Sequence, residues 1–132
     1  YHMMLGAMWE LDEAVKAAIE FIERPGDSVD WTNTIIIVTA DHATGYLRLS
    51  ENKTLGKGEL PVMTGANYSR SYPGGELSYA VGQHTNELVM LYAIGSGWEM
   101  FRGYEGFWYP GTRIIDNTHI FRVMCELAGI PE

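Results

Sequence analysis

The feature that most constrains this sequence is a continuous run of β-branched residues that leads into an acid and an imidazole. The run 34–39 reads TIIIVT, and Ala40, Asp41 and His42 follow it directly. Uninterrupted β-branched runs are typical of strands covered on both faces, as in a parallel sheet flanked by helices. We therefore predict a central strand, with Asp41 and His42 beyond its carboxyl end, where open α/β sheets bind their ligands.

Two helices and a second strand complete the expected framework. Apolar residues recur at three- and four-residue steps over 5–23, and Pro25-Gly26 ends that pattern. A second strand is expected over 87–94. Near the C-terminus, Asp116 or Asn117 can cap a helix that stops at Gly129. Helix, strand, strand and helix in this order indicate an α/β protein.

Two further segments interrupt this framework. Residues 50–82 are rich in Gly, Ser, Asn and Pro and show no sustained period, so we expect a long irregular excursion bordering a site. Residues 104–113 read YEGFWYPGTR and are expected to form an aromatic insertion. Exposed aromatic residues of this density could form a carbohydrate- or base-stacking platform, but we favour packing of the insertion against the domain.

Composition excludes several classes of partner. The 132 residues suffice for one small domain, and 17 Asp and Glu against 9 Lys and Arg give a net charge of −8. Such a surface repels phosphate backbones and anionic lipids, which excludes nucleic acid as a partner. Apolar runs such as Ile35–Val38 are far short of the ~20 residues that span a bilayer. Cys125 is the only cysteine, which excludes an internal disulfide.

Asp41, His42 and His84 are the candidate metal ligands. Carboxylate and imidazole groups suit zinc, and a sharp turn after the strand could aim Asp41 and His42 at one ion. His84 lies in GQHTNE, where the chain returns from the excursion and could approach the other two residues. On residue types alone, Asp41 could equally cap a turn, and His84 could equally be a solvated loop histidine.

The remaining polar candidates are expected to be structural. His119 lies within the pattern of the C-terminal helix, and His2 lies at the start of the chain, so both are read as structural or solvent-facing. Asp27-Ser28 precedes the central strand and would therefore lie at the opposite side of the sheet from Asp41. We reject it as a catalytic pair.

Several motifs, taken in order, resemble the C-terminal part of bacterial alkaline phosphatases. The resemblance covers nearly the whole chain and includes the first helix, with LDEAVK at 11–16. The motifs are TADHATG at 39–45, His84-Thr85 before LVMLYAIG at 88–95, FRG at 101–103, and DNT at 116–118. Met90 departs from the pattern, because a proline is common there in the family, and so does the insertion at 104–113.

The resemblance implies a three-layer α/β/α sandwich, of which this chain is the C-terminal portion. It also implies hydrolysis of phosphate monoesters with two zinc ions, a magnesium ion and a serine nucleophile. Asp41 and His42 match the pair that binds the zinc activating the serine, and His84 matches a ligand of the other zinc. The serine, its preceding acid, the phosphate-clamping arginine and the magnesium ligands should lie before Tyr1. We therefore expect the isolated chain to be inactive.

The helical pattern begins without a capping residue before it, which also leads us to expect a longer protein. The partners are then a phosphate monoester substrate and the missing N-terminal part. The family implies a periplasmic or secreted location and is often dimeric, which allows a homodimer. Two alternatives stay open: a phosphodiesterase or sulfatase-like enzyme with a different nucleophile, and a non-catalytic binding module.

Overall fold

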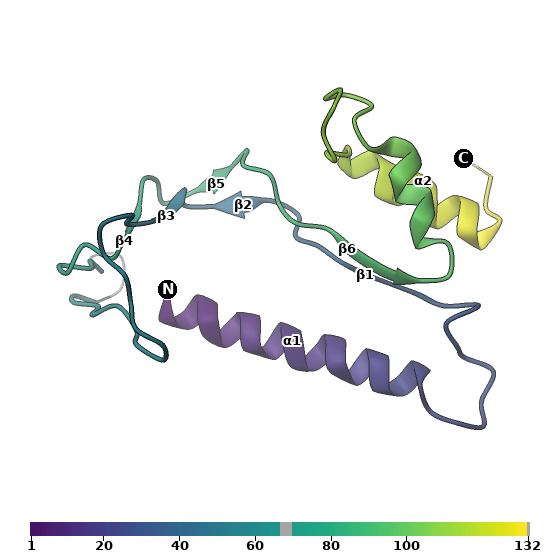
Figure 1. Cartoon of the computed structure of the whole chain (residues 1–132), viewed down its shortest axis with the longest axis horizontal. Helices are drawn as coiled ribbons and strands as arrows, with labels where there is room; N and C mark the ends of the chain where they lie inside the picture. Colours follow the sequence, from purple (N-terminus) through teal and green to yellow (C-terminus); the bar gives the residue numbers. More distant parts are fainter. Residues whose placement is uncertain (67–69, 132) are drawn as a thin grey trace. The chain divides into compact units, whose positions relative to one another are not determined.

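The computed structural model describes residues 1–66 and 70–131, with two principal helices and six short strands (Figure 1). None of the helices in this described part is long and apolar enough to cross a bilayer. In chain order the elements are α1 (His2–Ile22), β1 (Ile35–Val38), β2 (Ala43–Thr44), β3 (Leu47–Leu49), β4 (Leu77–Tyr79), β5 (His84–Thr85), β6 (Tyr92–Gly95), the 3₁₀ helix η2 (Trp98–Tyr104) and α2 (Asn117–Ala128).

The chain divides into two compact units, which we describe separately. The first comprises Tyr1–Asp12 and Thr39–Leu91, and the second comprises Glu13–Val38 and Tyr92–Glu132. Strands β2 to β5 belong to the first unit, whereas β1, β6, η2 and α2 belong to the second. All three predicted metal ligands are therefore in the first unit.

In the second unit, β1 pairs with β6 in an antiparallel ladder from Ile35 opposite Gly95 to Val38 opposite Tyr92 (Figure 1). The β-branched run does form a strand, but its residues are half-buried, which differs from the expected strand covered on both faces. The second predicted strand, 87–94, is wrong over its first half, because β6 begins only at Tyr92. β-Propensity favours extended backbone at Leu88–Leu91, but it does not supply a pairing partner.

Helix α2 has the ends that the sequence predicts. The Asp116 carboxylate accepts a hydrogen bond from the Thr118 backbone N–H at 3.0 Å and caps the N-terminus. Gly129 adopts the left-handed conformation with φ of 64° and ends the helix, and its N–H reaches back to the Cys125 and Glu126 carbonyls. Both ends thus follow the usual preference for a short acceptor at the start and glycine after the last turn.

The core of the second unit includes a buried imidazole. His119 is only 2 % exposed and lies on the same helix as buried Val123 and Cys125. Its ring stacks on Tyr104 with centroids 4.3 Å apart, and the ring of Phe107 meets it edge-on at 5.7 Å. The histidine therefore joins α2 to the end of η2 and to the start of the aromatic insertion.

In the first unit, two short antiparallel ladders follow each other along a ribbon, β2 with β5 and β3 with β4 (Figure 1). Strand β4 lies inside 50–82, so the prediction of an irregular excursion is wrong at its C-terminal end. Within the excursion, Thr64 and Ser71 also form an isolated bridge, while 67–69 lie outside the described residues. Pro73-Gly74-Gly75 does mark a turn just before β4, where the Gly75 N–H donates to the Tyr72 carbonyl at 2.9 Å, but a turn signal does not indicate that the returning chain pairs with β3.

Much of the helical apolar surface is exposed. Helix α1 covers the predicted 5–23 almost completely, yet Ile22 is its only residue that is fully buried. Met3, Met8 and Trp9 are exposed on α1, as is Phe121 on α2. Each helix thus leaves large apolar side chains in contact with solvent.

Candidate metal site

The β2–β5 ladder brings His42 and His84 together. Ala43 lies opposite Thr85 and Thr44 lies opposite His84, so His42, one residue before β2, is the diagonal neighbour of His84. Diagonal neighbours on one face of an antiparallel pair are within reach of each other when their side chains are long or aromatic. The two imidazole rings stack with centroids 3.6 Å apart and an interplanar angle of 25°. Two imidazoles that are 42 positions apart in the sequence are thus in direct contact.

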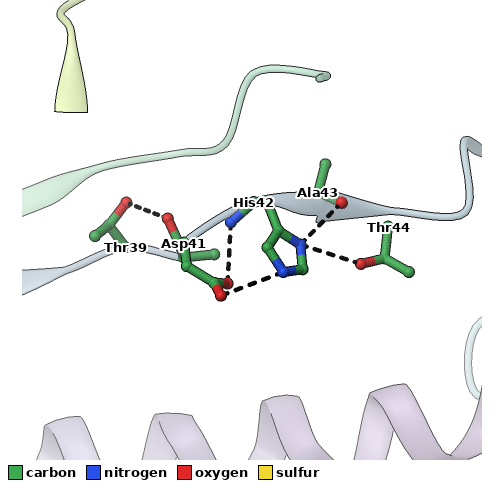
Figure 2. A network of polar contacts seen from close by, with 6 residues as sticks. Thr39, Asp41, His42, Ala43 and Thr44 are labelled. Atoms are coloured by element: carbon green, nitrogen blue, oxygen red, sulfur yellow. Dashed lines mark hydrogen bonds and ion pairs between the residues drawn. The ribbon is translucent and has the colours of Figure 1, made fainter. Parts of the chain in front are cut away.

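The Asp41 carboxylate lies at the Nε2 edge of the His42 ring (Figure 2). Its Oδ2 lies 3.2 Å from His42 Nε2, and its Oδ1 accepts a hydrogen bond from the His42 backbone N–H at 3.0 Å. The carboxylate is therefore held against its neighbour through both oxygens. Because the Asp41 side chain is 85 % exposed, water screens this pair and the charge contributes little to stability by itself.

The other nitrogen of His42 is held by the backbone. Nδ1 lies 3.1 Å from the Ala43 carbonyl oxygen and 3.4 Å from Thr44 Oγ1 (Figure 2). A carbonyl only accepts, so this contact is a hydrogen bond when Nδ1 carries the proton. In the neutral ring, the lone pair is then on Nε2 and points toward Asp41. This is the arrangement in which a metal-binding histidine donates through one nitrogen and coordinates through the other.

A tight turn after β2 shapes the ribbon. Gly45 and Tyr46, the two residues between β2 and β3, both have left-handed backbone conformations, with φ of 85° and 48°. A Cβ at Gly45 would lie 2.7 Å from Tyr79 Cδ1, so the tyrosine ring packs directly on the glycine backbone. Partial burial of this ring raises the pKa of the Tyr79 phenol above its usual value of 10. Glycine is therefore required both by the backbone conformation and by the contact.

A polar network that the sequence did not indicate lies beside the histidines. Arg48 Nη1 contacts Glu87 Oε1 at 2.6 Å, and Thr85 Oγ1 donates to Glu87 Oε2 at 3.2 Å. Tyr46 donates its hydroxyl to Asn86 Oδ1 at 3.0 Å. In the sequence, the spacing of Tyr46 and Arg48 places both side chains on one face of a strand. That spacing indicates these contacts only once residues 85–87 are known to lie beside residues 46–48.

Asp41 and His42 have the spacing of two zinc ligands, but no third donor among the described residues converges with them. Their 3.2 Å separation suits two donors on one tetrahedral ion with bonds of about 2.0–2.1 Å. His84 contributes a second imidazole and a third candidate donor, but it is stacked on His42 and does not converge with it on one point. Across residues 1–66 and 70–131, no group of three or more histidine, cysteine or acidic side chains gathers around one position. The described residues thus supply one donor pair and one adjacent donor.

The other residues singled out in the sequence have structural contacts. His119 is buried in the α2 cap, as the structural reading predicts, and His2 is the first residue of α1. Asp27 Oδ1 accepts a hydrogen bond from the Val29 N–H within a turn. In the aromatic insertion, Phe107, Trp108 and Tyr109 are all more than half exposed. Phe107 still meets His119 edge-on, so the favoured prediction that this segment packs against the domain is met at one edge of Phe107 and is wrong for Trp108 and Tyr109.

Comparison with known proteins gives no further assignment. No protein-family model, curated protein or solved structure matches this chain.

Proposed function

We propose that this chain carries the C-terminal metal-ligand residues of a zinc-dependent phosphate monoester hydrolase of the alkaline phosphatase type. The observation that carries the proposal is the arrangement of its three candidate ligands. The Asp41 carboxylate faces His42 Nε2 at 3.2 Å, and the His84 ring stacks on the same imidazole. These are the residues that the TADHATG and His84-Thr85 motifs single out.

Each residue has a defined role in this proposal. Asp41 and His42 hold one zinc ion, and His84 helps to hold the other. The two zinc ions and a magnesium ion, when bound, supply positive charge to the attacking and leaving oxygens of the phosphate ester. With an Nδ1 proton donated to the Ala43 carbonyl, the lone pair for coordination is on Nε2, the nitrogen that faces Asp41.

The chain alone holds too few donors for catalysis. Catalytic zinc sites usually have three protein ligands, whereas this chain offers two for one ion and one for the other. The remaining ligands, the serine nucleophile and the magnesium ligands are proposed to lie in a preceding part of the same polypeptide. The exposed Met8, Trp9 and Phe121 support this division, because a larger α/β/α core would cover such side chains. A periplasmic or secreted location and a homodimer belong to the same proposal.

Zinc titration and phosphatase assays test the proposal together. We expect the chain to bind zinc weakly, to lose that binding in His42→Ala, and to hydrolyse no aryl phosphate by itself. Co-expression with the segment encoded upstream should restore hydrolysis that chelators abolish and that Asp41→Ala removes. Hydrolysis by the isolated Asp41→Ala chain, or zinc binding that His42→Ala leaves unchanged, would overturn the proposal.

One observation favours a second candidate, a non-catalytic binding module. Phe107, Trp108 and Tyr109 present three exposed aromatic rings in one short segment, and Thr112 Oγ1 donates to the Tyr109 carbonyl at 2.6 Å to hold the turn. Exposed aromatic groups of this kind stack on ligands or on partner proteins. In this alternative the histidines are incidental, and zinc changes neither the stability nor the spectra of the chain.

A further inference from the structure

We propose that Glu87 is a positioning residue that keeps His84 stacked on His42. Its carboxylate joins the strand that carries His84 to Arg48 on the neighbouring ladder. The metal-binding part of this inference rests on the proposed function, whereas the contact between the two imidazoles does not.

The ladder that holds the two histidines is too short to fix them by itself. Strands β2 and β5 contain two residues each, Ala43–Thr44 and His84–Thr85. Two-stranded ribbons are only marginally stable in water even when they are longer. Beyond the ladder the backbone adds links at Gly45, whose N–H donates to the Gln83 carbonyl at 3.0 Å and whose carbonyl accepts from the Ala80 and Val81 N–H groups at 2.9 and 3.3 Å. Side-chain contacts are therefore needed to keep the rings 3.6 Å apart.

Glu87 supplies such contacts through both of its oxygens. Oε1 pairs with Arg48 Nη1 at 2.6 Å, and Oε2 accepts from Thr85 Oγ1 at 3.2 Å. Thr85 is the residue next to His84 in β5, while Arg48 lies in the middle of β3. The Glu87 side chain is 24 % exposed, so its charge-assisted hydrogen bonds are less screened than those of a fully solvated pair.

Tyr46 adds a second link in the same direction. The Arg48 guanidinium lies over the Tyr46 ring, 5.1 Å from its centroid, and the Tyr46 hydroxyl donates to Asn86 at 3.0 Å. Tyr46 also has a positive φ of 48°, which is uncommon for a residue with a side chain. Such a conformation persists where surrounding contacts over-determine it. Residues 46 and 48 therefore both hold the segment 85–87, Tyr46 through Asn86 and Arg48 through Glu87, where the contact from Thr85 also ends.

Removing the Glu87 charge should allow the end of β5 to separate from β3. His84 would then lose its fixed position over His42, although neither histidine has been changed. Mutation of residues that orient metal ligands typically lowers metal affinity by about 10- to 100-fold. Glu87→Gln should therefore act on the histidine pair without being a ligand.

The test uses the full chain and compares Glu87→Gln with Glu51→Gln, which removes the same charge from an exposed turn residue of the same unit. The first readout needs no metal: NMR of the imidazole ring protons, which stacking at this distance shifts upfield. The second readout is zinc affinity by competition with a chromophoric chelator. We expect Glu87→Gln to lose the upfield shifts and about 10-fold in zinc affinity, and Glu51→Gln to retain both.

Two further variants keep the test decisive if Glu87→Gln does not fold. Thr85→Val removes only the hydroxyl link and retains a β-branched residue in β5, and Arg48→Met removes only the cation. Each should weaken the ring-proton shifts, and combining Arg48→Met with Glu87→Gln should add little to either single change. If these variants keep the shifts of the unchanged chain, the inference is wrong. If the shifts respond but zinc does not bind even to the unchanged chain, the positioning role stands and the proposed function fails.

Discussion

The Nδ1 atom of His119 accepts a hydrogen bond from the backbone N–H of Asp116 at 3.1 Å, so that an imidazole completes the N-terminal cap of α2. Glutamate or glutamine usually occupies this position and accepts the same hydrogen bond. The imidazole has a second role that those residues lack, because its faces and edges pack between aromatic rings. Helix capping and core packing therefore depend on one side chain.

Replacement of His119 should separate these two roles. His119→Leu keeps an apolar group in the core but leaves the Asp116 N–H without its acceptor, which should cost about 1 kcal/mol of the free energy of unfolding. His119→Gln keeps an acceptor and should retain part of that energy. Urea unfolding followed by circular dichroism measures both, and a leucine variant more stable than the glutamine variant would contradict the capping role.

Acid should weaken the start of α2 through Asp116. The Thr118 hydroxyl and backbone N–H donate to this carboxylate and hold its pKa below the ordinary value of 3.8. The folded state therefore binds this proton less readily than the unfolded state, so the stabilisation is complete above pH 3.8 and is lost as pH falls through the lower, folded pKa.

Asp116→Asn is the matched control, because asparagine also caps helices but does not titrate. Thermal melts between pH 6 and pH 3 should show a smaller acid-induced decrease in the asparagine variant than in the unchanged chain. The Thr32 hydroxyl likewise lowers the pKa of Asp30, but that contribution is present in both proteins and cancels in the comparison. Equal decreases in the two proteins would refute the prediction.

Gly45 should be far less tolerant of a side chain than Gly58, although both have nearly the same backbone conformation. Their φ angles are 85° and 82°, yet a Cβ at Gly58 would meet open space, whereas one at Gly45 would collide with Tyr79. Gly58→Ala should cost about 1 kcal/mol from backbone strain, and Gly45→Ala about 2–3 kcal/mol because overpacking is added. Unfolding in urea gives both values, and similar costs would show that the Tyr79 ring moves away freely.

Zinc should stabilise the folded chain, and removal of zinc should reverse the effect. At a free zinc concentration about 100 times Kd, a ligand that binds only the native state adds about 2.7 kcal/mol to the free energy of unfolding. We expect EDTA, and separately His42→Ala, to abolish the corresponding rise in Tm. A melting temperature that zinc does not change would favour the binding-module alternative.

The sequence allowed the C-terminal end of α1 and both ends of α2 to be predicted, because those signals are local, whereas the role of Asp41, His42 and His84 as metal ligands stays a prediction. Asp116 and Gly129 specify the limits of α2 within a few residues of themselves. The contact between His42 and His84 depends on a pairing across the whole excursion, which periodicity does not encode. For the same reason, the β-branched run indicated a strand of a parallel sheet, whereas β1 pairs with β6 in an antiparallel ladder.

The role of His119 was hidden for a different reason. A capping box is recognised by glutamate or glutamine at its third helical position, and histidine there is not part of that signature. The imidazole was correctly expected to be structural, but its hydrogen bond depends on which ring nitrogen lacks a proton. That choice is determined by the folded surroundings and not by the residue type.

The two ends of the excursion are held next to each other, so the segment between them can vary in length. Strand β3 pairs with β4, and the Ser50 N–H donates to the Glu76 carbonyl at 2.8 Å, so both ends of the intervening segment are fixed next to each other. Each doubling of a flexible loop adds only about 0.6 kcal/mol to the entropy of closing it. Insertions between Ser50 and Glu76 should therefore lengthen the excursion while leaving the β3–β4 pairing, and with it the spacing of His42 and His84, intact.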